Sequence, residues 1–175
     1  MLTLNQIAPP INTKTINGEE INLHSLQGKK VLIKFHRFSG CPVAQNEVNE
    51  YIQRQKELFS AGVETIVFLH NNKEKVLPVF KELPGFHMIA DREKKFYKTY
   101  QAQFSWKPMF SPASWGAIFS AFFHGYFPRF TKFQGGVIGI PADFLLDEKS
   151  RIVDIHYGRH FGDSWSVSDV LRKLN

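Results

Sequence analysis

A single cysteine, Cys41, lies in the stretch FHRFSGCPVAQNEV. It follows an apolar run and a short loop, and Pro42 after it suits the first position of a helix. A helix N-terminus carries partial positive charge and unpaired amides, which favour a thiolate, the nucleophilic form of cysteine. This position therefore predicts an activated sulfur. The alternative is a small, buried and inert side chain, because free cysteines are among the most buried residues.

Three polar residues of the same loop could assist the sulfur. Arg37, four residues before Cys41, could place a cation beside it, or could be a surface arginine. Ser39 could donate a hydrogen bond to a substrate oxygen, or could simply form the turn. We expect a structural role for His36, which would lie on the other side of the strand end.

Metal binding is not favoured by the sequence. One cysteine cannot form an internal disulfide or a cysteine-based zinc site. His156, His160 and Asp163 are possible ligands, but on a strand end and a loop their spacing defines no common face. We expect neither a metal nor another cofactor.

The hydrophobic pattern predicts an α/β fold in one domain, residues 1–175. Apolar runs at 31–35 and 63–69 flank a helical pattern at 42–61, which indicates two parallel strands and a crossover helix. A later pair of runs predicts a β-hairpin, so the central sheet should be mixed. The remaining predicted elements are a helix from about 72 to 83 interrupted by Pro78, a strand at 86–90, a helix at 91–101, strands at 137–147 and 151–157, and a helix from Ser166 or Ser168 to Leu174.

The segment 104–133 breaks this alternation, because eleven of its thirty residues are Phe, Trp or Tyr. Ser111 with Pro112 begins a predicted helix that ends near Gly125, and its large residues, led by Trp115 and Phe119, share one face. This helix needs a partner surface. It could cover the protein's own core or form a homodimer interface, or it could dock a partner, an apolar ligand or a membrane surface. The segment's cations, Lys107, Arg129 and Lys132, fit the last of these uses.

Charge and hydrophobicity argue against nucleic-acid binding and against a membrane-spanning segment. The net charge is +6, but most cations alternate with acids, as in NNKEKV, which is typical of a solvated surface. No nucleic-acid-binding motif is present, so we expect no nucleic acid partner. No apolar run reaches the roughly 18 to 20 residues of a transmembrane segment, and the first residues do not have a signal-peptide pattern, so we expect a cytoplasmic location.

Several stretches resemble one family. GEEINLHSLQGKKVLIKFHRFSGCP, MIADREKKFYKTYQA and GGVIGIPADFLLDEKSRIV are similar, in order and spacing, to the peroxiredoxin-like proteins of the AhpC/TSA group in the thioredoxin-like superfamily. The resemblance covers about residues 7–103 and 134–174. It implies a thioredoxin-like fold, a mixed central sheet flanked by helices, with segment 104–133 as an aromatic-rich helical insertion.

The resemblance also implies parts of the site. Ile140 and Pro141 would form a cis peptide beside Cys41 and, with Pro42, contact substrate, whereas a trans proline at a strand start is the alternative. The last strand would return towards the sulfur and bring Arg159 near it as a second cation.

The sequence departs from the family's pattern at informative positions. Peroxidatic members have a proline and a Thr or Ser where this chain has Lys34 and Phe38, and thioredoxin-like reductases have a second cysteine where it has Ala44. The resemblance therefore implies a one-cysteine antioxidant oxidoreductase in which Cys41 reduces a peroxide or exchanges with a disulfide. An external thiol or a thioredoxin-type reductant would resolve the sulfenic acid or mixed disulfide. The alternative is a non-catalytic binding module that docks through segment 104–133.

Overall fold

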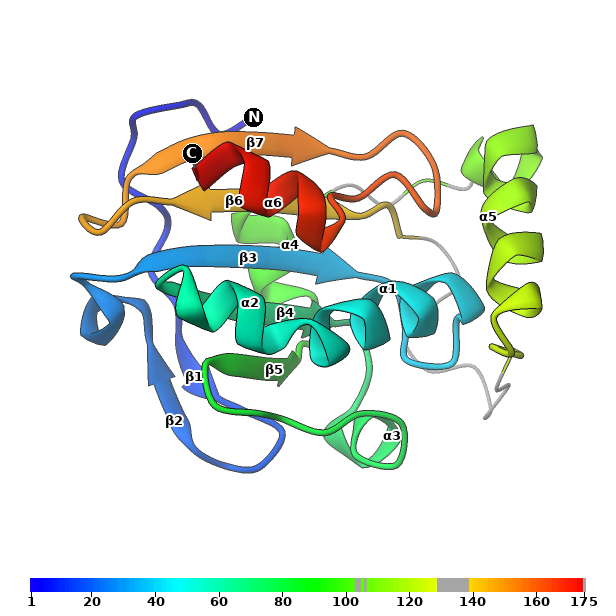
Figure 1. Cartoon of the computed structure of the whole chain (residues 1–175), viewed down its shortest axis with the longest axis horizontal. Helices are drawn as coiled ribbons and strands as arrows, with labels where there is room; N and C mark the ends of the chain where they lie inside the picture. The colour runs from blue at the N-terminus through cyan, green and yellow to red at the C-terminus, as the bar shows by residue number, and fades with distance from the viewer. Residues whose placement is uncertain (103–104, 106, 129–138, 175) are drawn as a thin grey trace.

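The structure, a computed structural model, describes residues 1–102, 105, 107–128 and 139–174 and is built on a five-stranded sheet (Figure 1). The strand order is β5-β4-β3-β6-β7. The central strand β3 pairs in parallel with β4 and antiparallel with β6. The predicted parallel pair and the predicted hairpin are both confirmed. The strands are β3 (Lys30–His36), β4 (Val63–Leu69), β5 (Phe86–Ala90), β6 (Ala142–Leu146) and β7 (Ile152–Tyr157).

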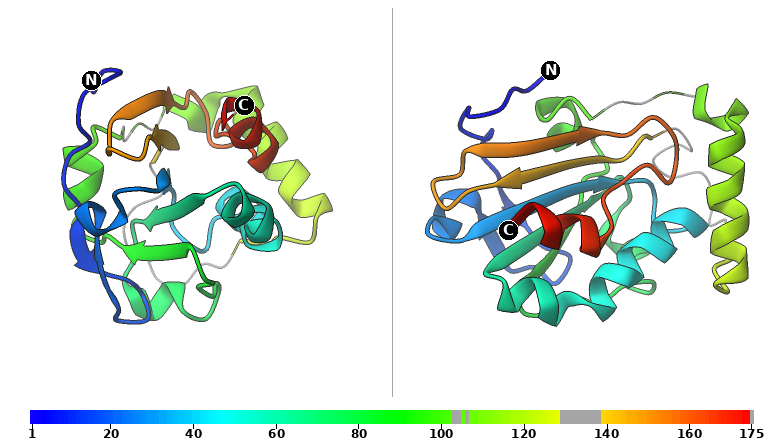
Figure 2. Two further views of the ribbon diagram at one scale, coloured as in Figure 1. Left: turned by 60° about the vertical axis from the view of Figure 1, so that its left-hand side comes forward. Right: turned by 45° about the horizontal axis from the view of Figure 1, so that its top comes forward.

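Alternate side chains of the central strands fill two apolar cores, one on each face of the sheet. Ile33 and Phe35 pack with α4 (Lys95–Thr99) on one face. Leu32 packs on the other face with α1 (Pro42–Gln53), α2 (Gln55–Ser60) and α6 (Val167–Leu174), and the two views of Figure 2 show helices on both sides of the sheet. These layers hold the carboxyl end of β3, and the loop that follows it, in a fixed place.

Some predicted helices are shorter than expected. The pattern at 42–61 forms two helices, α1 and α2, that meet at Arg54. The helix predicted near 72–83 is reduced to α3 (Lys73–Val76), which ends before Pro78, whose ring excludes a continuous helix. α4 begins four residues later than predicted, because the Asp91 carboxylate accepts hydrogen bonds from the N–H groups of Lys95 and Phe96 at its first turn.

The N-terminal part contains elements that the sequence pattern did not predict. Strands β1 (Asn12–Lys14) and β2 (Glu20–Asn22) form a separate antiparallel pair, followed by a short 3-10 helix, η1 (Leu23–Leu26). Each is only three or four residues long, so none shows a hydrophobic period.

The predicted aromatic helix exists as α5 (Pro112–Phe123), preceded by the 3-10 helix η2 (Lys107–Phe110). Its orientation agrees only in part with an apolar face turned towards the protein's own core. Ser114 and Ala121 are its buried residues, whereas Trp115 and Phe119 are 52% and 56% exposed. Small residues allow α5 to approach α1 closely. Ile118 and Phe122 line the pocket described below, whereas the rings of Phe119 and Phe123 lie outside. The rest of segment 104–133, and Val137 and Ile138 of the predicted strand, lie outside the described residues.

In the part of the chain that the structure describes, no helix is long and apolar enough to cross a bilayer.

Candidate active site

Cys41 lies where β3 gives way to α1, as the sequence predicts. It is the N-cap residue of α1, and Pro42 is the first helical residue. The Cys41 N–H donates to the carbonyl of Phe38, and the Cys41 carbonyl accepts from the N–H of Gln45. These bonds close the loop around Gly40 and fix the sulfur at the start of the helix.

A buried cation contacts the sulfur. Arg37 Nη1 donates to Cys41 Sγ at 3.2 Å, and its guanidinium lies 3.6 Å from the centre of the Phe161 ring. Burial lowers the pKa of Arg37, while the charges of Cys41 and Glu47 oppose this shift. An arginine keeps its charge in proteins, so it favours negative charge on the sulfur that it contacts.

The sulfur lines an apolar pocket of about 260 Å³ that is covered from outside by α5 and η2. Cys41 is only 1% exposed, and it packs with Val43 and Ala44 against Ala117 and Ile118 of α5. Among the described residues that line the pocket, Arg37 and Ser114 are the charged or hydroxyl-bearing side chains beside the cysteine. The full lining consists of Arg37, Phe38, Cys41, Pro42, Met109, Ser114, Trp115, Ile118, Phe122, Pro128 and Phe161.

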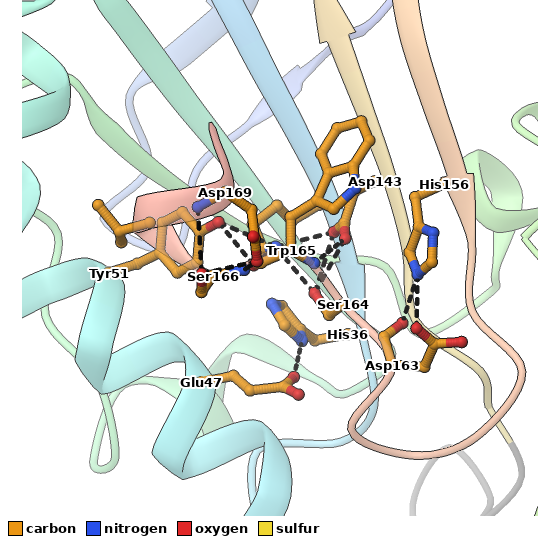
Figure 3. Close-up of polar contacts among 12 residues, drawn as sticks. His36, Glu47, Tyr51, Asp143, His156, Asp163, Ser164, Trp165, Ser166 and Asp169 are labelled. Atoms are coloured by element: carbon orange, nitrogen blue, oxygen red, sulfur yellow. Dashed lines mark hydrogen bonds and ion pairs between the residues drawn. The ribbon is translucent and has the colours of Figure 1, made fainter. Parts of the chain in front are cut away.

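A carboxylate supports the cation from the first turns of α1. Glu47 Oε2 lies 3.1 Å from Nδ1 of the buried His36, as Figure 3 shows, and its charge also acts on Arg37. The His36 carbonyl accepts a hydrogen bond from the Tyr97 hydroxyl. His36 thus connects the end of β3 to both faces of the sheet and is not a lining residue of the pocket.

Two other predicted site residues lie elsewhere. The Ser39 hydroxyl donates to the carbonyl of Lys75, and its N–H donates to the Asn71 side chain, so Ser39 ties the loop to α3. Arg159 is exposed, and its backbone N–H donates to the Asp163 carboxylate. Neither residue lines the pocket, whereas Phe161, two residues after Arg159, does.

The prediction of a cis peptide at Ile140-Pro141 is wrong, because none of the described peptide bonds is cis. A trans bond is the default for proline, and Pro141 directly precedes β6, where it needs no N–H to donate. Its carbonyl accepts from the N–H of Gly158, where an added Cβ would lie 2.9 Å from that carbonyl oxygen. Ile140 and Pro141 therefore hold the ends of β6 and β7 together.

The sequence pattern did not predict a buried ion pair between neighbouring strands. Lys34 Nζ lies 2.8 Å from Asp143 Oδ1, and both side chains are completely buried. Lys34 also donates to the Trp165 carbonyl and the Ser164 hydroxyl, and Asp143 accepts from the Trp165 N–H; Figure 3 shows the contacts of Asp143. A lysine inside VLIKF and an aspartate inside ADFLL, two otherwise apolar runs, were the signals that could have revealed the pair.

The histidines near the end of β7 do not form a metal site. His156 Nε2 lies 2.8 Å from Asp163 Oδ1, and its ring stacks on Trp165 (Figure 3). Among the residues with described positions, no group of three or more His, Cys, Asp or Glu could hold a metal ion.

Comparison with known proteins identifies the family of the chain. The AhpC/TSA family matches residues 4–155. Among curated protein sequences, none matches the chain.

Solved structures show the same fold. A peroxiredoxin 6 of Arenicola marina has a TM-score of 0.68 and 15% identity, over 99% of this chain and 72% of that one. A yeast mitochondrial 1-Cys peroxiredoxin has a TM-score of 0.71 and 18% identity, over 99% and 75%. A thiol:disulfide interchange protein DsbE from Chlorobium tepidum has a TM-score of 0.64 and 15% identity, over 100% of both chains. The predicted thioredoxin-like fold is therefore confirmed, and the family match over most of its length shows that this chain belongs to the AhpC/TSA family.

Proposed function

We propose that the protein is a one-cysteine thiol oxidoreductase in which Cys41 reduces a peroxide. The observation that carries the proposal is the 3.2 Å contact between Arg37 Nη1 and Cys41 Sγ at the wall of a pocket. A buried, permanently charged guanidinium stabilises negative charge on the sulfur, and the thiolate is the form that attacks. An inert apolar cysteine would need no such partner.

The reaction follows from the groups in the pocket. The Cys41 thiolate attacks one peroxide oxygen; the S–O bond forms as the O–O bond breaks. The second oxygen leaves as hydroxide or alkoxide and takes up a proton to give water or an alcohol. Sulfur is oxidised by two electrons to a sulfenic acid, and the peroxide is reduced. Arg37 stabilises both the attacking thiolate and the charge that moves to the leaving oxygen.

Ser114 supports substrate orientation. Phe38 stands at the position where the resemblance would lead one to expect a hydroxyl, but α5 contributes the Ser114 hydroxyl to the same pocket. Its oxygen accepts from the Phe161 N–H at 3.2 Å, and a hydroxyl that accepts one hydrogen bond can donate another. We propose that it donates to a peroxide oxygen.

Regeneration requires thiols from outside the chain, because Cys41 is the only cysteine. A first thiol attacks the sulfenic sulfur and releases water, which gives a mixed disulfide, and a second thiol attacks that disulfide and restores Cys41. The proposal assumes a cytoplasmic setting, where small thiols and thioredoxin-type reductants are kept reduced.

The test is to add an equimolar peroxide to the reduced protein and trap the product with a sulfenic acid reagent, followed by intact-mass analysis. We expect one adduct, at Cys41, and none in Cys41→Ser. Ser114→Ala should slow adduct formation without changing alkylation by iodoacetamide, which needs no oxygen to be oriented. A wild-type protein that reacts with peroxide no faster than a free cysteine would refute peroxidase activity.

Disulfide exchange is the second candidate, favoured by the structural likeness to a thiol:disulfide interchange protein. Cys41 would then form a mixed disulfide with a small disulfide faster than it forms a sulfenic acid. The same protein sample, given a disulfide in place of the peroxide, distinguishes the two reactions by the mass of the product.

A further inference from the structure

The α5 region exposes an unusual set of large apolar side chains, which we call the outer aromatic face: Met109, Phe110, Trp115, Phe119, Phe123 and Phe127. These side chains are between 45% and 91% exposed. Six Phe or Trp side chains in the described part of the chain are largely exposed, and five of them belong to this face. The sixth, Phe59, lies on α2. Soluble proteins expose single apolar residues freely but seldom gather them in this way.

The packing of α5 on the rest of the protein relies on its small residues. α5 turns Ser114, Ala117 and Ala121 towards α1 and the loop after β7, where a Cβ added at Gly162 would lie only 2.8 Å from Ala117 Cβ. Trp115, Phe119 and Phe123 follow one another at intervals of four residues, so they form a row along the helix, in which Trp115 also lines the pocket. Figures 1 and 2 show α5 at one end of the molecule, beyond the sheet. A row of rings at an edge suits a flat apolar surface.

Charge identifies the kind of surface. From residue 107 to residue 127, the stretch that carries this face, the sequence has Lys107 and no Asp or Glu. Lys107 begins η2, next to Met109 and Phe110 of the outer aromatic face. A two-fold homodimer through this stretch would bring Lys107 of both copies to one apolar interface, and the stretch offers no acid to pair with either. A surface with anionic groups outside and an apolar layer beneath them would complement both the exposed rings and the positive charge.

We propose that the outer aromatic face docks on the surface of a bilayer that contains anionic phospholipids. The rings enter the boundary between headgroups and acyl chains, and Lys107 remains among the headgroup phosphates. α5 then lies in the plane of the interface, and the sheet stays in water. This docking does not depend on the chemistry of Cys41, so it holds equally for Cys41→Ser.

The experiment is co-sedimentation of the full chain with vesicles, either of phosphatidylcholine alone or of phosphatidylcholine mixed with phosphatidylglycerol, at low and high salt. We expect binding to the mixed vesicles that salt weakens, together with a blue shift of tryptophan emission. Phe119→Ser with Phe123→Ser should lower the partition coefficient about tenfold or more. Lys107→Glu should weaken binding at low salt and change it little at high salt.

The matched control is Phe59→Ser, since Phe59 is 52% exposed and Phe119 is 56% exposed. It should bind as the wild type does. If the double variant unfolds at a lower temperature than the wild type, the single variant Phe123→Ser replaces it in the binding test. That side chain is 91% exposed and contributes little to folding. The proposal is overturned if the wild type stays in solution with both kinds of vesicle, or if the Phe variants bind as the wild type does. A wild-type dimer that these variants dissociate, without vesicle binding, would instead assign the face to a second copy of the chain.

Discussion

Replacing Arg37 by methionine tests whether the guanidinium activates the sulfur. Arg37→Met keeps an apolar stem of similar length in the pocket but removes the charge that lies 3.2 Å from Cys41 Sγ. Arg37→Lys keeps the charge and loses the planar stacking on the Phe161 ring. The two variants therefore separate the effect of charge from that of geometry.

The size of the effect follows from the distance. Two unit charges 3.2 Å apart interact by about 5 kcal/mol at an effective dielectric constant of about 20, and by about 1.3 kcal/mol in bulk water. Arg37 is only 5% exposed, so the environment lies nearer the first limit. We expect Arg37→Met to slow the reaction of Cys41 with a small electrophile at neutral pH by about ten- to a thousandfold. Arg37→Lys should lie between this variant and the wild type.

The assay is the initial rate of alkylation by iodoacetamide across a pH series, read by intact mass, with thermal unfolding to confirm that each variant is folded. At neutral pH the wild type should react faster than Arg37→Met. If Arg37→Met, in a folded state, reacted as fast as the wild type at every pH, the argument that Arg37 holds an anionic sulfur would be wrong.

Three further changes test the surroundings of the site. Asp143→Asn leaves Lys34 as a buried cation without its counter-charge and should cost about 3–5 kcal/mol in denaturant unfolding, whereas Lys34→Met combined with Asp143→Leu should recover much of that loss. Asp169→Asn tests the start of α6: hydrogen bonds from Ser166 hold the pKa of Asp169 below its ordinary 3.8, so the carboxylate stabilises the fold above about pH 4 and loses this effect as the pH falls through the lower, folded value. The variant should be less stable than the wild type by about 0.5–1 kcal/mol at pH 7, and the difference should vanish in acid. Phe161→Leu removes the ring face beneath the guanidinium and should lower stability by about 1–2 kcal/mol, while alkylation slows less than in Arg37→Met.

The sheet could be predicted from the sequence because its strands are buried apolar runs. The runs at 63–69 and 86–90 match β4 and β5 residue for residue. The position of Cys41 was predictable for the same reason, since Pro42 and the preceding run determine where a strand must end and a helix begin. Local pattern and tertiary structure agree there.

The other parts of the site depend on contacts that no local pattern records. Phe161 reaches the guanidinium of Arg37 from the loop after β7, and Ser114 reaches the pocket from α5. The orientation of α5 was also unpredictable, because a helix rich in large apolar residues would ordinarily bury them. α5 instead approaches α1 closely, which only small residues allow, so Ser114 and Ala121 are its buried residues.

The burial of Cys41 has a kinetic consequence. A side chain that is 1% exposed can meet a reagent in solution only after α5, η2 or their side chains move aside. At high reagent concentration the observed rate should therefore reach a ceiling set by this opening, equal for every molecule small enough to enter. A bulky protein reductant needs a wider opening than a small thiol does. When only large reductants are present, reduction of the oxidised Cys41, rather than its oxidation, should therefore limit turnover.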